Sequence, residues 1–181
     1  MRIQYSAILC EGAAEEAIIE ILLEYQAIII DEEYLIDGRP LRIRSADDFC
    51  DRYLVSDFEG KVNIYRILDS KNEKFSFKGK NKKIAEEKCN IYNIYTAPEI
   101  EMLIIVSEGH YKKFKNSSIR KPSDYCKIEL KMKKVKEYQF VKNYFSDIKM
   151  LLRAICEYHR VSPKQKNGGQ HLYDLLKEEF K

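Results

Sequence analysis

Two acidic residues stand at the points where predicted β-strands end. Glu11 follows the apolar run Ile3–Cys10, and Asp69 follows Lys61–Leu68, in which apolar and polar residues alternate. In open α/β sheets, ligands bind beside the carboxyl ends of the strands. Two neighbouring carboxylates repel each other when both are ionised, and a divalent cation removes that repulsion. The pair therefore predicts a Mg²⁺ or Mn²⁺ site, because carboxylates, waters and substrate phosphates are the usual ligands of Mg²⁺.

A second acidic cluster, Glu99 and Glu101, follows the next predicted strand, Cys89–Tyr95, and opens a helix. One of these two acids would complete the metal site as a further ligand or as a base. Residues two apart on a helix do not share a face, so we expect at most one of them to reach a site shared with Glu11. The structural alternative is that each acid only stabilises a helix N-terminus, with Asp69 as a turn residue.

Lysines follow Asp69 in the sequence and are interleaved with Phe75 and Phe77. Basic residues alternating with aromatic ones suit phosphate contacts and base stacking, although a solvated lysine-rich loop is the more frequent explanation. The candidate nucleic-acid-binding residues are Lys71, Lys78, Lys80, Lys82 and Lys83. A second run of lysines, one of which could neutralise charge in a transition state, comprises Lys131, Lys133, Lys134 and Lys136.

The composition limits the function classes without choosing among them. The 32 basic and 29 acidic residues give a net charge of +3, which neither requires nor excludes a nucleic-acid partner. The three histidines have no ligand spacing, and CxxC, a Gly-rich phosphate loop and GxSxG are absent, so the sequence supports no zinc, P-loop or serine-hydrolase site. Five widely spaced cysteines indicate a reducing compartment. With no signal peptide and only short apolar runs, we expect a cytoplasmic protein without a membrane partner.

The remaining pattern predicts the elements that position these residues. The predicted strands are Ile3–Cys10, Leu41–Arg44, Lys61–Leu68 and Cys89–Tyr95. Helices are predicted over Ala13–Ile29, Ala46–Leu54 with Ser45 as N-cap, the second half of Lys71–Lys88, Glu99–Glu108, Val135–Tyr158 and His171–Phe180, with a polar loop over Ser117–Asp124. This order predicts the α/β class, with a mostly parallel sheet of about four strands flanked by helices. We expect one domain, with a core over 1–116 and a C-terminal helical extension over 117–181 packed on it.

The run Ile8–Glu15, an apolar strand followed by Glu-Gly and a helix, resembles the opening of Toprim-type domains. These domains occur in topoisomerases, bacterial primases, overcoming-lysogenisation-defect (OLD) nucleases and small RloB-like proteins of bacterial defence loci. In that family, the glutamate and an Asp-x-Asp motif after a later strand together bind Mg²⁺. Glu11 matches the glutamate and Asp69 the first aspartate, whereas Lys71 stands in place of the second. The segment Pro98–Ile105 is similar to the helix after the fourth strand of the RloB-like members, and the whole resemblance covers about Ile3–Tyr111.

The resemblance implies a Mg²⁺-dependent nuclease, or a related phosphoryl-transfer protein acting on DNA or RNA, in phage defence or on a mobile element. In this interpretation Glu11 and Asp69 hold the metal, and Glu99 or Glu101 is a further ligand or a base. The alternative is a catalytically inactive Toprim-like interaction module of a multi-protein complex, in which Lys71 supplies a cation between Glu11 and Asp69. A third hypothesis is a simple nucleic-acid-binding domain that uses the lysines after Asp69.

Overall fold

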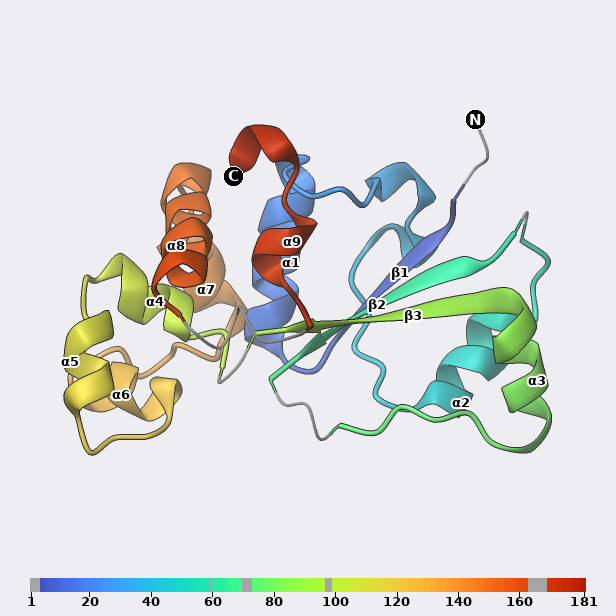
Figure 1. Ribbon diagram of the computed structural model, residues 1–181, viewed down its shortest axis with the longest axis horizontal. Helices are drawn as coiled ribbons and strands as arrows, with labels where there is room; N and C mark the ends of the chain where they lie inside the picture. Colours follow the sequence, from blue (N-terminus) through green and yellow to red (C-terminus); the bar gives the residue numbers. More distant parts are fainter. Residues whose placement is uncertain (1–3, 59, 70–72, 97–98, 163–168) are drawn as a thin grey trace.

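A four-stranded parallel sheet forms the centre of the protein, as seen in a computed structural model that describes residues 4–58, 60–69, 73–96, 99–162 and 169–181 (Figure 1). The strand order is β1-β2-β3-β4, and every neighbouring pair is parallel. The strands are β1 (Ser6–Cys10), β2 (Val62–Leu68), β3 (Cys89–Tyr95) and β4 (Gln170–His171). The predicted α/β class, with a parallel sheet flanked by helices, is therefore confirmed.

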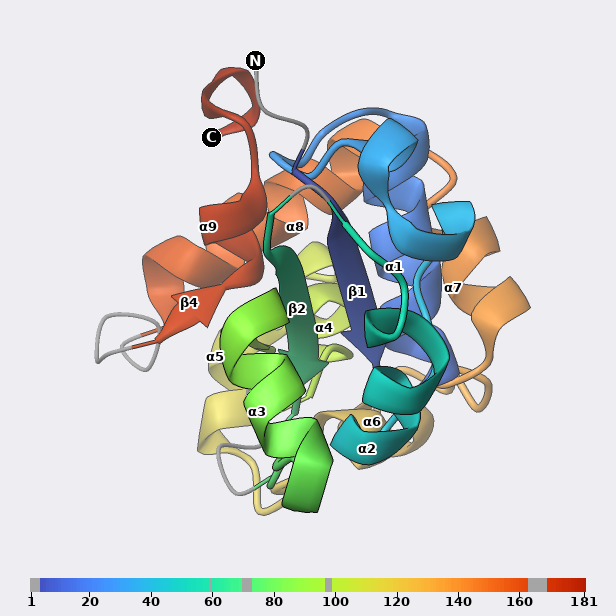
Figure 2. The same ribbon diagram turned by 90° about the vertical axis from the view of Figure 1, so that its right-hand side faces the viewer.

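Helices cover both faces of the sheet (Figures 1 and 2). One face carries α2 (Ala46–Phe49), the π-helical η3 (Cys50–Leu54) and α3 (Gly79–Lys88). The larger core cluster lies on the opposite side, and it includes side chains of α1 (Ala13–Glu24), α4 (Met102–Ser107), α5 (Tyr111–Asn116), α6 (Pro122–Ile128), α7 (Tyr138–Tyr144), α8 (Ile148–Val161) and α9 (Leu172–Leu175). Short 3₁₀ turns complete the described chain at Glu32–Tyr34, Ile36–Gly38 and Glu178–Phe180.

Strand β1 is buried on both faces, which explains its continuous apolar sequence. Ile8 and Cys10 belong to the larger core cluster, under α1, and Ala7 and Leu9 belong to the smaller cluster, under α2 and α3. Because successive side chains of a strand point to opposite faces, β1 contributes to both core clusters. Packing against a core on each face therefore fixes the position of β1, and with it the start of the segment that follows the strand.

The fourth strand of the sheet is not the one that the sequence predicted. Leu41–Arg44 forms no strand; only Leu41 makes an isolated bridge, to Leu9. The fourth position belongs to Gln170–His171, which pairs with the end of β3. The ring nitrogen Nδ1 of His171 lies 2.8 Å from the carbonyl oxygen of Tyr95, which fastens this two-residue strand to β3.

Several predicted helices end or break earlier than their apolar periodicity indicates. The predicted helix Val135–Tyr158 is wrong as a single element, because it divides into α7 and α8, and the Asp147 carboxylate accepts a hydrogen bond from the Lys149 N–H at the start of α8. The helix predicted to reach Ile29 ends at Glu24, and Gln26 adopts a positive φ of 51°.

Two polar segments contain more structure than predicted. The loop expected over Ser117–Asp124 is already helical from Pro122, a residue that favours the first position of a helix. The C-terminal helix divides into α9 and a 3₁₀ turn. Across the described segments, no helix combines the length and the apolar character needed to cross a membrane.

Candidate functional site

The parallel register brings the carboxyl ends of β1, β2 and β3 to one edge of the sheet (Figure 1). Glu11 follows β1 directly, Asp69 follows β2, and Thr96 follows β3. The register pairs Cys10 with Ile67, so the two acids leave adjacent strands at nearly the same level. The structure therefore places both predicted metal ligands at the same edge.

A third acid, Glu15, lies at this edge and was not singled out from the sequence. It occupies the first turn of α1, is only 5% exposed, and is within hydrogen-bonding reach of Asp69. Gly12, the N-cap of α1, makes room for it: a Cβ at this position would stand 2.7 Å from the Glu15 carboxylate oxygen Oε2. The available signal was the position of Glu15 three residues after the N-cap, where a glutamate side chain folds back onto the start of its helix.

Asp69 is positioned by Thr96 on the neighbouring strand. The Thr96 hydroxyl lies 2.9 Å from the Asp69 oxygen Oδ1, and the Thr96 N–H donates to the Leu68 carbonyl at 2.9 Å. Burial raises the pKa of the Asp69 carboxyl, the Thr96 hydrogen bond opposes that rise, and repulsion by Glu99 adds to it. Asp69 is thus a fixed carboxylate in an environment that disfavours its charge.

Glu99 and Glu101 both contact one ammonium group, that of Lys136. The Lys136 Nζ is 3.4 Å from an oxygen of Glu99 and 3.9 Å from an oxygen of Glu101. The sequence predicted that at most one acid of this pair would reach the site, on the assumption that both lie in a helix. Helix α4 begins only at Met102, so both acids lie ahead of its regular turns and the rule for helix faces does not apply. Pro98, the first residue of the segment that is similar to the RloB-like members, lies outside the described residues.

Lys136 belongs to the second lysine run identified in the sequence and lies between α6 and α7. Burial lowers the pKa of its ammonium, but attraction by Glu101 and Glu99 outweighs that effect, and the net pKa is raised. Its side chain is 52% exposed, whereas that of Glu101 is 3% exposed. A half-exposed side chain therefore supplies the positive charge beside a deeply buried acid.

The acids of this edge destabilise one another's charged forms. Burial, followed by contact with and repulsion by Glu73, raises the pKa of Glu11 to about 7. Burial and repulsion by Asp69 raise the pKa of Glu15 to about 7, and burial raises that of Glu101 to about 7. The Glu11 oxygen Oε1 is buried and finds no hydrogen-bond partner among the described residues. Such an oxygen is available to a proton or a cation.

Two arginines flank Glu11 on the face covered by α2 and α3. Arg44 donates to the Glu11 carbonyl oxygen at 3.0 Å. Arg66, on β2, is 6% exposed, donates to the Asn93 side-chain oxygen at 3.0 Å, and its guanidinium lies 4.5 Å from the centre of the Phe75 ring. A fixed positive charge thus stands close to the acids without neutralising any of them through an ion pair in the described structure.

The donor set fits Mg²⁺ or Mn²⁺ in kind, because it consists of carboxylate oxygens and includes the free oxygen of Glu11. Within the described residues, however, no three Asp, Glu, His or Cys side chains are already gathered as a metal-holding group. Glu11, Glu15 and Asp69 would hold such an ion after side-chain adjustment, since their carboxylates already interact electrostatically.

The predicted nucleic-acid-binding lysines lie elsewhere. Lys71 lies outside the described residues, and Lys78, Lys80, Lys82 and Lys83 are exposed at or within α3. Helix α3 leads into the first residue of β3, at the amino end of the sheet, whereas the acids lie at the carboxyl end (Figure 1). The structure does not bring these lysines together with the acidic edge.

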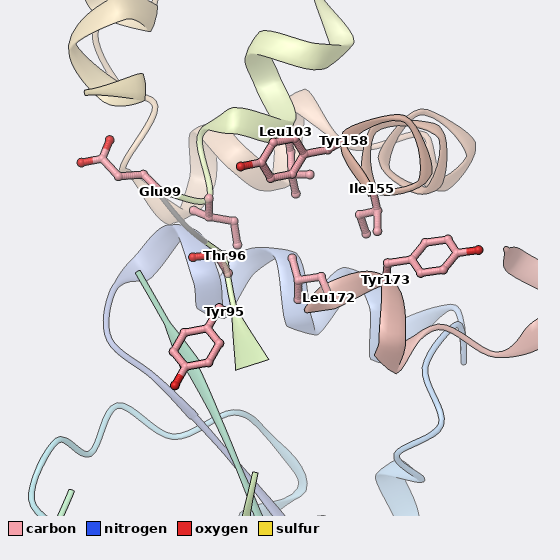
Figure 3. A pocket seen from close by; sticks show the side chains of 9 residues that line it. Tyr95, Thr96, Glu99, Leu103, Ile155, Tyr158, Leu172 and Tyr173 are labelled. Carbon is pink, nitrogen blue, oxygen red and sulfur yellow. The ribbon is translucent and has the colours of Figure 1, made fainter. Parts of the chain in front are cut away.

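A narrow hollow adjoins the acidic edge on the side of α8 and α9. Its lining residues include Thr96, Glu99, Tyr158 and Tyr173 together with apolar side chains (Figure 3). Its interior volume is about 10 Å³, room for about one water molecule. Figure 3 shows the Glu99 carboxylate pointing away from these side chains, toward the segment that carries Ser123, whose N–H donates to Glu99 at 2.8 Å. With an interior volume of about 10 Å³, the hollow is too small for a nucleobase.

Comparisons of this chain with protein-family models, with curated proteins and with solved structures found no match.

Proposed function

We propose that the carboxyl edge of the sheet is a Mg²⁺- or Mn²⁺-dependent phosphoryl-transfer site that acts on DNA or RNA as a nuclease or a related enzyme. One observation carries this proposal: acids from separate segments meet at one edge, and the pKa values of Glu11, Glu15 and Glu101 are all raised to about 7. Strongly shifted carboxyl groups that repel one another are typical of functional sites. A divalent cation relieves that repulsion and is suited to phosphate chemistry.

Each side chain has a distinct task in this proposal. Glu11, Glu15 and Asp69 hold the cation, and Thr96 orients the Asp69 carboxylate. When bound there, a divalent cation would supply Lewis-acid chemistry toward a water molecule and the phosphate. Glu101 accepts a proton, because a pKa of about 7 suits a base at neutral pH. Lys136, which already contacts Glu101, stabilises negative charge on the phosphate.

A second candidate function is a catalytically inactive interaction module. The observation in its favour is that Lys136 already sits at the acid cluster as an internal cation, 3.4 Å from Glu99. In that protein the ammonium permanently replaces the metal, and the acids serve only to hold the segment between α6 and α7. A role in phage defence or on a mobile element, with a partner protein, rests on the resemblance to Toprim-type domains, and a cytoplasmic location rests on the cysteine pattern; both belong to the proposal under either function.

The two candidates differ in their response to metal. Metal that binds only the folded state must raise its stability by mass action. We expect millimolar Mg²⁺ or Mn²⁺ to raise the unfolding midpoint of the wild type and to support cleavage of end-labelled single-stranded DNA or RNA. Asp69→Asn should abolish both effects while barely changing the stability without metal, because the repulsion of Asp69 by Glu15 disappears together with the ligand.

The matched control is Glu33→Gln, at an exposed position outside the site, which should behave as the wild type. A wild-type midpoint that neither metal changes, together with the absence of cleavage, would contradict the enzyme and leave the interaction module.

A further inference from the structure

One edge of the sheet is open over five residues of β3. Strand β4 pairs only with Ile94 and Tyr95, so Cys89–Asn93 have no strand beside them on that side in the described part of the chain. The opposite edge of the sheet differs, because Leu35 and Leu41 bridge to β1 and cover it. Among the described residues, the first five residues of β3 therefore form an unpaired stretch of strand edge.

The open segment lacks the features that normally protect an edge strand. Its sequence, Cys-Asn-Ile-Tyr-Asn, contains no charged residue and no proline, and Ile91 is 40% exposed. Natural edge strands are usually blunted by lysines, prolines or bulges, because an unprotected edge is a template for another strand. An edge of this composition favours hydrogen-bonded pairing with a further β-strand.

A groove runs beside the open edge, between β3 and α3. Its lining includes the apolar side chains Phe77, Ala85, Cys89 and Ile91. Its two charged lining residues, Lys82 and Glu86, lie one helical turn apart on α3 and so share a face of that helix. The groove thus has an apolar floor next to a strand edge and one charge of each sign on its helical wall.

We propose that two copies of this chain form a dimer by antiparallel pairing of their β3 edges about a twofold axis at Ile91. Such an axis pairs Cys89 with Asn93 of the second copy and Ile91 with its own equivalent. The pairing uses the five open residues and leaves the pairs between β3 and β4 untouched. The two sheets then form one continuous sheet of eight strands.

Charge complementarity favours a second copy as the occupant of the groove. A twofold axis perpendicular to the sheet keeps both α3 helices on the same face and sets them antiparallel. Lys82 of each copy then faces Glu86 of the other copy, which gives two equivalent pairs of opposite charge. The paired Ile91 side chains, on the face that lines the groove, fill its apolar floor between the helices. This surface lies away from the acidic edge, so the dimer is independent of the proposed phosphoryl transfer.

The test is the mass of the full chain in solution, measured by sedimentation equilibrium from low to high micromolar concentration. We expect the wild type to approach twice its 21.4 kDa chain mass. Ile91→Lys places two ammonium groups opposite each other and should weaken dimerisation by at least ~100-fold. The control Ile128→Lys changes another exposed isoleucine, on α6, and should remain dimeric. Circular dichroism of both variants verifies that they fold.

A charge exchange tests the twofold arrangement itself. Lys82→Glu should weaken the dimer by about 10-fold. Adding Glu86→Lys in the same chain should restore it, because both pairs between positions 82 and 86 of the two copies are then re-formed with reversed sign. A wild type that stays monomeric at high micromolar concentration, or that forms polydisperse aggregates, overturns the proposal. Equal weakening by Ile91→Lys and Ile128→Lys also overturns it, and a double variant no tighter than Lys82→Glu overturns the twofold geometry.

Discussion

The two ends of the sheet hold their charges in opposite ways. At the carboxyl end, Glu15 and Glu101 are 5% and 3% exposed, and each has a raised pKa. At the amino end, Lys80 and Lys83 project from α3 into solvent. A buried carboxylate costs stability unless a proton or a cation compensates its charge, whereas an exposed lysine costs little. The stability of the acidic edge is therefore expected to depend on pH more strongly than that of the amino end.

The largest expected effect is a loss of stability with rising pH. The pKa values of Glu11, Glu15 and Glu101 are about 7 in the folded state against an ordinary value of 4.5, so the folded state binds protons more tightly than the unfolded chain. That advantage is fully present below pH 4.5 and is lost as the pH rises through 7. A shift of this size in a single buried carboxyl lowers the free energy of unfolding by on the order of 3 kcal/mol over this window, so we expect the three acids together to lower it by more than that. Urea unfolding at several pH values measures it, and a flat profile would show that the acids do not interact as described.

Glu15→Gln should sharpen the comparison by removing one buried charge. We expect the variant to be more stable than the wild type by about 1–2 kcal/mol at about pH 8, and to have a shallower pH profile. The matched control on the same helix is Glu24→Gln, whose carboxylate is 55% exposed and pairs with Lys142. Its loss should lower stability by at most ~1 kcal/mol. If both variants change stability in the same direction, burial is not what distinguishes these two acids.

Gly12→Ala should disturb the site with little effect on the fold. The φ of Gly12 is −135°, which any residue adopts, so the substitution strains no backbone. The added Cβ conflicts only with the end of the Glu15 side chain, which is free to move away. We expect stability within about 1 kcal/mol of the wild type, with a weaker pH dependence and a smaller metal effect. Nuclear magnetic resonance titration of the glutamate carboxyl carbons follows the change, and an unaltered Glu15 titration would contradict the assigned contact.

The smallest effects should come from the lysines of α3. Lys80→Gln and Lys83→Gln should each change the free energy of unfolding by no more than ~0.5 kcal/mol, and neither should alter its pH dependence. The prediction that these lysines bind nucleic acid is tested separately, by the affinity for single-stranded DNA at two salt concentrations. A lysine that contacts phosphate weakens binding and reduces the salt dependence when it is replaced. Unchanged affinity and salt dependence in both variants would rule out this role.

Sequence patterns predicted those features that depend on local chemistry. Strand β3 has the predicted bounds, and the Ser45 side chain caps α2 by accepting a hydrogen bond from Asp48 N–H at 3.2 Å, as its sequence position indicates. Placing Glu11 and Asp69 at one edge required only the parallel order of the strands. The break before α8 was missed, although Asp147, a favourable N-cap, marks it in the sequence.

The features that were missed depend on tertiary contacts. Gln170–His171 is a strand only because β3 offers it an edge, and two residues carry no periodicity. Glu15 appeared to belong to the polar face of its helix, but the first turn of α1 abuts the sheet edge and buries it. The contact of Lys136 with Glu99 joins residues 37 apart in the sequence, and no local pattern indicates such a pairing.

We propose that the acidic edge exchanges its protons for a divalent cation. Titration calorimetry with Mn²⁺ near pH 7, repeated in buffers of different ionisation enthalpy, measures ion binding and proton release together. The wild type should bind one ion per chain and release protons, because carboxyl groups with a pKa of about 7 are partly protonated there. Asp69→Asn should lose the binding. A wild type that gives no binding heat with millimolar Mn²⁺ in any buffer would contradict this proposal and leave Lys136 as the cation that compensates Glu99 and Glu101.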